Sequence, residues 1–180
     1  SRNVLFRVGG LNTSSSFDGN FSSGHGLIKE GSGTFTLTGT NSYTGSTTVS
    51  NGVLALVGEA YSTNSSSIGV AAPGILDVSG LAGGTLSAGN VAQSVVGDGT
   101  IRGSLVVGSL GTVSPGFSIG TLTVTNTVTL GGSTIMELNT TNSPATNDLI
   151  SAAAITAGGT LTVTNIGPDL VAGDSFKLFS

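Results

Sequence analysis

A short phrase, Gly-Thr followed by an apolar residue, recurs along the chain and opens most of its strand-like segments. Its six copies begin at Gly33, Gly84, Gly99, Gly111, Gly120 and Gly159. Looser copies begin at Gly52 (GVLAL) and Gly74 (GILDV), and most intervals run from about ten to the low twenties. An imperfect repeat of this kind predicts a solenoid, because one coil cannot bury its own apolar face and has to stack on a neighbour.

The segments that follow the phrase alternate between Thr and apolar residues. Three clear cases are residues 34–38, 121–125 and 160–164. A period of two places one face of a strand on a core and the other toward water, and Thr suits the outer face because its β-branch favours extended backbone. Helix signals are nearly absent, and residues 149–157 (LISAAAITA) are ambiguous between helix and strand.

Charge is scarce, which restricts the classes of partner. Charged residues make up 8% of the 180 residues, the formal net charge is −4 and the pI is about 4.5. The five basic residues are scattered: Arg2, Arg7, Lys29, Arg102 and Lys177. They cannot form the positive stripe that follows a phosphate backbone, so we expect no nucleic-acid partner.

Residues 31–58 contain no Asp, Glu, Lys or Arg. In stacked coils, Thr and Ser hydroxyls and Asn amides can solvate the outer faces, whereas like charges in neighbouring coils would repel. Cysteine is absent, so neither disulfides nor thiolate metal sites are expected. No apolar run reaches the roughly 18 residues that cross a bilayer. This composition suits the exterior of a bacterial cell.

Two architectures fit these patterns. Asn51-Gly52, between two apolar alternations, is a hairpin signal by local rules, and several hairpins would make an antiparallel β-sandwich. In a parallel solenoid the same pair would form a corner, with Gly at positive φ. We expect an all-β fold, a right-handed single-stranded parallel β-helix. About 20 residues per coil predict about nine coils and a rod of about 40 Å.

Residues 31–56 (GSGTFTLTGTNSYTGSTTVSNGVLAL) resemble the autotransporter-associated β-strand repeat. The matching residues are Gly31, Gly33, Thr34, Leu37, Gly39, Asn41, Tyr43, Gly45, Thr47, Val49, Gly52 and Leu54, with Phe35 at a usual Leu position. Residues 113–139 (VSPGFSIGTLTVTNTVTLGGSTIMELN) are similar to the Pro-Gly-x-Ser-x-Gly-x-Leu segment of the same passenger-like proteins. The resemblance implies a secreted or surface-exposed bacterial parallel β-helix.

The resemblance also bears on domain organisation. It implies one solenoid segment over residues 1–180, in which residues 1–26 are weakly matched N-terminal coils. Residues 27–58 are the best-matched repeat, and residues 113–180 are passenger-like C-terminal coils. Because both ends stop within alternating runs, we expect the segment to be part of a longer chain.

The single histidine is the sharpest catalytic candidate. Gly24-His25-Gly26, followed by Ile28-Lys29, resembles a motif of polygalacturonases, β-helical enzymes that need several aspartates beside the histidine. Asp18 is the one acid before Glu30, and Asp148 lies many coils away. We therefore expect His25 to be a solvent-facing corner residue and the chain to have no catalytic, cofactor-binding or metal-binding residue.

Other candidate sites have simpler explanations. Asp77, Asp98, Asp148, Asp169 and Asp174 recur at no fixed spacing, and the calcium-binding nonapeptide repeat is absent. Asp169 with Asp174 is the best candidate for a calcium loop, but turn residues bonded to local backbone are favoured for all five. Gly97-Asp98-Gly99 lacks the Lys and helix of a phosphate loop, and Pro115-Gly116 is typical of a turn. The sequons at Asn12, Asn20, Asn64 and Asn139 are expected by chance in such a composition.

These observations predict a non-enzymatic extracellular protein, a β-helix stalk, coat or fibre subunit. Alternation at both ends (residues 2–8 and 175–180) suggests uncapped strands and self-association head-to-tail into filaments. One alternative is an adhesin that binds carbohydrate or a host surface, which needs exposed aromatics. Tyr43, Tyr61 and 7 Phe supply few. A β-helical polysaccharide-degrading enzyme, which needs clustered acids, is less favoured.

Overall fold

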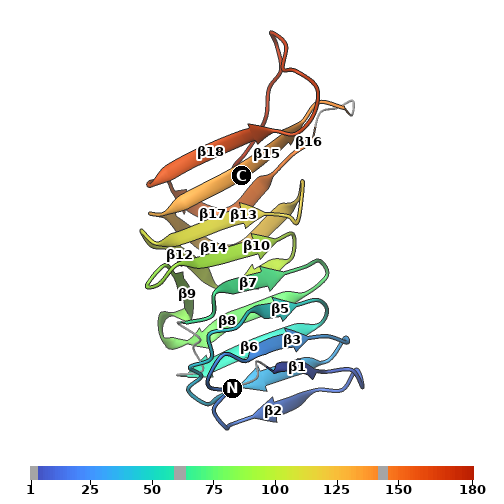
Figure 1. The fold of residues 1–180 in the computed structure, drawn as a ribbon, viewed down its shortest axis with the longest axis vertical. Coiled ribbons are helices and arrows are strands. Elements are labelled where there is room, and N and C mark those ends of the chain that lie inside the picture. The colour runs from blue at the N-terminus through green and yellow to red at the C-terminus, as the bar shows by residue number, and fades with distance from the viewer. Residues whose placement is uncertain (1–3, 59–63, 142–145) are drawn as a thin grey trace.

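The chain winds into a rod of stacked β-coils, with the N-terminus near one end and the C-terminus near the other (Figure 1). The computed structural model describes residues 4–58, 64–141 and 146–180. Nearly all strand pairs in these residues are parallel, and the strands stack as a β-solenoid of about 6 turns. The helical content of the described residues is a single 3-10 turn, η1 (Ala82–Gly84). The predicted all-β parallel solenoid is confirmed.

One nine-stranded sheet, sheet A, runs the length of the rod. Its strands are β1 (Leu5–Val8), β3 (Gly26–Lys29), β5 (Thr47–Val49), β7 (Ser67–Val70), β10 (Gln93–Gly97), β13 (Gly111–Pro115), β15 (Ser133–Asn139), β16 (Thr146–Asn147) and β18 (Thr160–Asn165). The short strand β16 pairs antiparallel with β15, and the other pairs are parallel.

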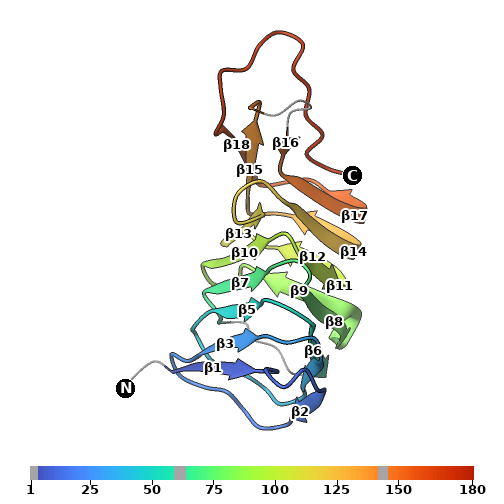
Figure 2. The same ribbon diagram turned by 90° about the vertical axis from the view of Figure 1, so that its right-hand side faces the viewer.

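The second nine-stranded sheet, sheet B, lies on the other side of the bore (Figure 2). Its strands are β2 (Ser15–Phe17), β4 (Thr34–Leu37), β6 (Val53–Gly58), β8 (Ile75–Leu81), β9 (Thr85–Ala88), β11 (Thr100–Arg102), β12 (Ser104–Val107), β14 (Thr121–Leu130) and β17 (Leu149–Thr156). The first part of the long strand β14 pairs with β11 and its last part pairs with β12. Because β12 also pairs with β9, the upper coils have a second stack of strands, β9–β12–β14, beside β8–β11–β14. The ambiguous segment 149–157 is thus a strand.

In both sheets the strand register places residues of similar type in successive coils directly above one another. In sheet B, Phe35 pairs with Leu54, Leu54 with Leu76, and Leu76 with Ile101, and all four side chains are buried. The intervening Thr residues face outward, which confirms the period-two prediction for residues 34–37 and 121–124. Val, Leu and Ile therefore fill the bore, and each coil covers the apolar face of the next.

The upper end of the rod departs from this pattern. On β18, Leu161 and Val163 continue the columns of Thr134 and Met136 but are 48% and 44% exposed. Every residue of β18 is exposed, because among the described residues no further coil packs over it. The chain after β18 rises beyond the last coil and returns (Figure 2), and Phe179 then forms a parallel bridge with Ile150.

The antiparallel alternative is wrong. Asn51-Gly52 joins β5 in sheet A to β6 in sheet B, so it is a corner between sheets rather than a hairpin turn. Gly52 has φ 63° there. An alanine Cβ would lie 2.4 Å from the Gly31 carbonyl oxygen of the adjacent coil, so only Gly fits this corner.

The estimate of about nine coils is also wrong, since the solenoid has about 6 turns. Coil length varies more than the regular interval assumed. Val95 pairs with Ile68, 27 residues earlier, and with Val113, 18 residues later. The longer interval contains β8, η1 and β9, and the shorter one contains the short strands β11 and β12. Pairing in sheet A continues through both intervals, whereas two pairs of sheet B contain register shifts.

Candidate functional site

His25 lies at the corner just before β3 and contacts the N-terminal strand. Its Nδ1 accepts a hydrogen bond from the Val4 amide at 3.1 Å, and its ring meets Phe6 edge-on at 5.5 Å between centroids. The side chain is half-buried rather than solvent-facing as expected, because Phe6 covers one side. The carboxylate of Glu30 is engaged by Arg7 at 3.1 Å. His25 is thus placed to hold β1, and Glu30 forms an ion pair.

Aromatic rings gather around this end of the bore. Phe21 lies 5.1 Å from Phe6, 4.7 Å from Phe17 and 6.2 Å from Tyr43 between ring centroids, in tilted or edge-on pairs. Such geometries are favourable for aromatic rings. Phe17 and Phe21 pack against the buried core, so most of the aromatic area at this end is structural. Tyr61 lies outside the described residues.

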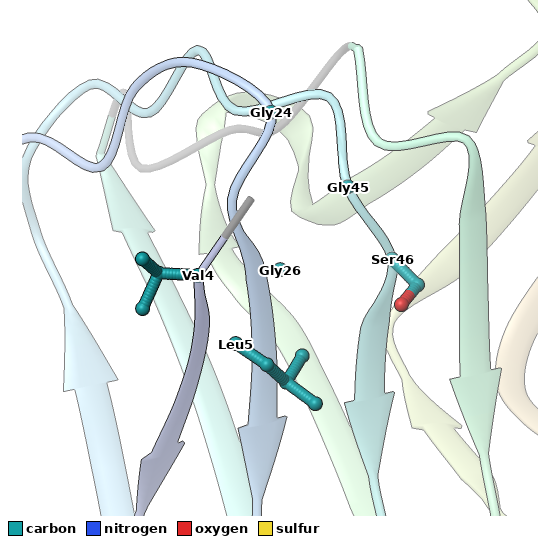
Figure 3. Close-up of a pocket in the computed structure, with 6 residues that line it drawn as sticks. All are labelled: Val4, Leu5, Gly24, Gly26, Gly45 and Ser46. Carbon is teal, nitrogen blue, oxygen red and sulfur yellow. The ribbon is translucent and has the colours of Figure 1, made fainter. Parts of the chain in front are cut away.

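A shallow hollow of about 180 Å³ opens on the outer face beside His25. Leu5 and Ser46 flank it, and Gly26 lies between their strands (Figure 3). A Cβ at Gly26 would come within 2.9 Å of the Leu5 side chain and of the Ser46 carbonyl oxygen. The lining is apolar apart from backbone and one hydroxyl, so the hollow offers no acid or base.

Two of the candidate aspartates bond to their own turns, as predicted. Asp77 accepts from the Ser79 amide at 3.0 Å and pairs with Arg102 at 2.8 Å. Burial would raise the pKa of Asp77, but the hydrogen bonds from Ser79 and the Arg102 ion pair outweigh it and lower the pKa. Asp174, half of the calcium candidate, accepts from the Val171 amide at 2.8 Å.

Two other aspartates bond to distant parts of the chain, contrary to the expected local turns. Asp98 accepts from the Ala72 amide, 26 residues earlier, at 2.9 Å. Asp148 is fully buried and accepts from the amides of Gly120 and Glu137 at 2.9 and 2.8 Å. Within residues 4–58, 64–141 and 146–180, no three His, Cys, Asp or Glu side chains gather closely enough to hold a metal ion.

Lys29 is a buried cation that the sequence patterns did not reveal. Its side chain points into the bore with 0% exposure, in the column between Val8 and Val49. Nζ donates to the carbonyl oxygens of Glu30, Gly31 and Asn51 at 2.8, 2.7 and 3.1 Å. Burial lowers the pKa of Lys29, opposed by the charge of Glu30. The ammonium therefore bridges corner carbonyls of two coils.

The polar residues of the resembling repeat are also buried. Tyr43 Oη lies 2.6 Å from Thr47 Oγ1, which lies 3.2 Å from Ser65 Oγ in the next coil. Gln93 Nε2, one coil further, donates to the Ser65 carbonyl at 2.6 Å. Asn41 accepts from the Phe21 amide at 2.9 Å. These side chains face the interior and join successive coils, so their role is in stacking.

One aromatic side chain stands out on the outer surface. Phe117, in the loop between β13 and β14, is 65% exposed. Its ring lies over Gly69 on the outer face of sheet A, 3.7 Å from the position of a Cβ on that glycine, and the Val96 side chain lies 3.8 Å from the same position. Hydroxyl residues form a register column on the same face: Ser67, Ser94, Thr112, Ser133 and Thr160. The surface there combines hydroxyls with one aromatic ring.

Comparison with known proteins gives a family match over a short part of the chain. Residues 27–56 match the family described as Passenger-associated-transport-repeat. The matched residues run from β3 to β6 and include Lys29, Asn41, Tyr43 and Thr47. No curated protein matches the chain. The match and the solenoid together fit an autotransporter-associated β-helix repeat protein, as the resemblance implied. Among the described residues, no helix has the length and apolar character needed to cross a membrane.

Proposed function

We propose that this chain, with its passenger-associated transport repeat, is a non-enzymatic structural segment of a secreted or surface-exposed bacterial protein. In this role it is a stalk, a coat component or a fibre subunit. Its work is mechanical: stacked coils hold a rod together through backbone hydrogen bonds, and no side chain performs chemistry. The matched repeat supports the passenger-type surface assignment.

The observation that carries the proposal is where the repeat's polar residues lie. Asn41, Tyr43 and Thr47 are each at most 4% exposed and bond to neighbouring parts of the solenoid. Residues used to bind or transform a ligand would face a cleft or the surface. These positions instead satisfy buried polar groups between coils.

Self-association is supported by the two ends of the rod. Phe6 on β1 and Val163 on β18 are 37% and 44% exposed, although both lie in columns that are buried elsewhere. Uncovered strand edges with apolar side chains recruit another chain. Either further coils of a longer chain or a second copy placed end to end would cover these two edges, and the second arrangement would extend the rod into a filament.

The first experiment measures the size and shape of the assemblies that the purified protein forms in solution. Light scattering after size-exclusion chromatography, with negative-stain microscopy, should show linear multimers that lengthen with concentration. Val163→Glu should shift them toward single rods, because a charge at the contact must be desolvated. Thr162→Glu, one position before Val163 on the outward face of β18 and beside Ile135 of β15, is the matched control and should leave assembly unchanged.

Each part of the proposal has its own adverse result. A short monomeric rod at high concentration would reject the filament and leave the stalk or coat role. Release of sugars from polygalacturonate or another polysaccharide would reject the non-enzymatic role. Failure of antibodies against the chain to label intact producing cells or their medium would reject the extracellular location.

A carbohydrate-binding adhesin is the second candidate, favoured by Phe117. An exposed ring beside a column of hydroxyls on sheet A can stack on a sugar face while the hydroxyls bond to it. Binding to insoluble polysaccharides such as cellulose and chitin would be tested in a sedimentation assay. Phe117→Ala should abolish such binding, and Phe17→Leu, a change in the interior, should not.

A further inference from the structure

Three segments of the upper rod meet at the carboxylate of Asp148. Oδ1 accepts from the amide of Gly120, which precedes β14, and Oδ2 accepts from the amide of Glu137 on β15. The backbone completes the junction: the Asp148 amide donates to the Glu137 carbonyl at 2.9 Å, and the Leu149 amide donates to the Gly120 carbonyl at 3.0 Å. The start of β17 is thus fastened to two other elements at one buried acid.

The Glu137 side chain brings a like charge close enough to act on this acid. It is half-buried, and its Oε2 is enclosed without a hydrogen-bond partner. An enclosed carboxylate oxygen without a donor is costly in the ionised form. Burial raises the pKa of Asp148, the charge of Glu137 raises it further, and the two amide hydrogen bonds oppose the shift.

The other charged groups around the junction do not neutralise the pair. Asp98 lies beside Gly120, with its Cβ 3.0 Å from the position of a Cβ on that glycine, and adds a third acid. Asn147 Nδ2 donates to the backbone carbonyl of Lys177 at 2.8 Å, while the Lys177 residue itself is exposed. The Pro115–Gly120 loop contributes no ionisable side chain.

We propose that buried Asp148, with Glu137 as its like-charged neighbour, is a proton-binding switch that fastens the last coils, β17 and β18, more tightly in mildly acidic solution than at neutral pH. One proton taken from solvent by Asp148 removes the cost of burying its charge and, to a smaller extent, the repulsion from Glu137. A protonated carboxyl group keeps acceptor capacity, so the amides of Gly120 and Glu137 retain their partners. This inference does not depend on whether the rods assemble.

The sign follows from proton binding in the two states. A raised folded-state pKa means that the folded junction binds a proton more readily than the open chain does. The protection of β17 and β18 therefore rises as pH falls through the folded-state pKa, and the gain is complete below about 3.9, the value of an unfolded Asp. Asp77 acts in the opposite direction, but its lowered pKa confines that loss to pH below 3.8. Between neutral pH and about pH 4 the switch dominates.

The test is native-state hydrogen exchange followed by mass spectrometry from pH 8 to pH 4.5, corrected for intrinsic exchange rates. Peptides from β17 and β18 report the switch, and peptides from β4 and β6 are the internal reference. Protection in β17 and β18 should increase toward acid, by up to about tenfold for each unit by which the pKa is raised. The reference peptides should change much less.

Glu137→Gln removes the like charge and keeps the backbone amide that bonds to Asp148. It should raise protection of β17 and β18 at neutral pH and reduce its pH dependence. Asp148→Asn should abolish the pH dependence, and if that variant does not fold, Glu137→Gln carries the test alone. Asp174→Asn, at an exposed turn, is the control and should keep the original profile. Flat or decreasing protection toward acid, or an unchanged profile in Glu137→Gln, would overturn the proposal.

Discussion

Replacing Lys29 with methionine tests whether the buried cation holds the corners of the solenoid. Methionine has a similar length and fills the same part of the bore, so the substitution removes the charge and the donors with little change in volume. The carbonyl oxygens of Glu30, Gly31 and Asn51, now 2.7–3.1 Å from Nζ, would lose this donor.

The expected magnitude comes from two opposing terms. Each buried acceptor left without a donor costs about 1–3 kcal/mol, so three cost about 3–9 kcal/mol. Removal of the ammonium recovers its desolvation penalty, which amounts to several kcal/mol for a buried ion. We expect a net loss of about 3 kcal/mol in the free energy of unfolding. Lys29→Ala also loses three methylenes at about 0.8 kcal/mol each and should cost about 5 kcal/mol.

Urea unfolding monitored by far-UV circular dichroism measures both changes. The matched control is Lys177→Met, which makes the same substitution at an exposed lysine and should stay within about 0.5 kcal/mol of the parent. If Lys29→Met were as stable as Lys177→Met, the three carbonyls would not need the ammonium, and the structural role of Lys29 would be rejected.

Three further substitutions test other parts of the solenoid, each by urea unfolding. Gly52→Ala should lower the free energy of unfolding by at least about 3 kcal/mol, because φ is 63° and the new Cβ would lie 2.4 Å from a carbonyl oxygen. The control Gly58→Ala, at φ 67° in open space, should lose only the left-handed backbone strain of about 1–2 kcal/mol. Equal losses in the two variants would contradict the crowded corner. Tyr43→Phe removes a buried hydroxyl 2.6 Å from a threonine and should cost about 1–2 kcal/mol, and a neutral effect would mean that the inter-coil network is not coupled. Arg102→Met should cost no more than about 1 kcal/mol, less in high salt, because the ion pair with Asp77 is half-exposed.

The strands and their stacking were predictable because they depend on local patterns. Alternation of Thr with apolar residues defines both faces of a strand, and a repeated Gly-Thr phrase indicates that coils recur. Asn51-Gly52 shows the limit of local rules, since the same two residues suit a hairpin and a corner. A corner forms when the strand after Asn51-Gly52 pairs with a strand of the preceding coil, and a hairpin forms when it pairs with the strand just before the turn.

The buried charges could not be predicted, because their burial depends on register across coils. Lys29 lies in a short segment (GLIK) whose alternation alone does not say which side faces the bore. Asp148 directly follows β16, which pairs antiparallel with β15. This pairing places the Asp148 carboxylate next to Gly120, 28 residues earlier in the chain, and buries it. Loop lengths between coils decide such encounters, and they vary along this chain.

Three charged residues of this chain, Lys29, Asp98 and Asp148, bond to backbone groups at places where the strand ladder is interrupted. Within strands, each amide and carbonyl finds a partner one coil away, but corners interrupt that ladder. Lys29 supplies donors to corner carbonyls, and Asp98 and Asp148 supply acceptors to backbone amides of other segments. Removing one of these ions leaves backbone groups unpaired. The ion pairs Arg7–Glu30 and Arg102–Asp77 instead lie at the surface and are partly exposed. Recognition through Phe117 and the hydroxyl column of sheet A would depend on neither pair, so it should be nearly insensitive to salt, which distinguishes it from electrostatic binding.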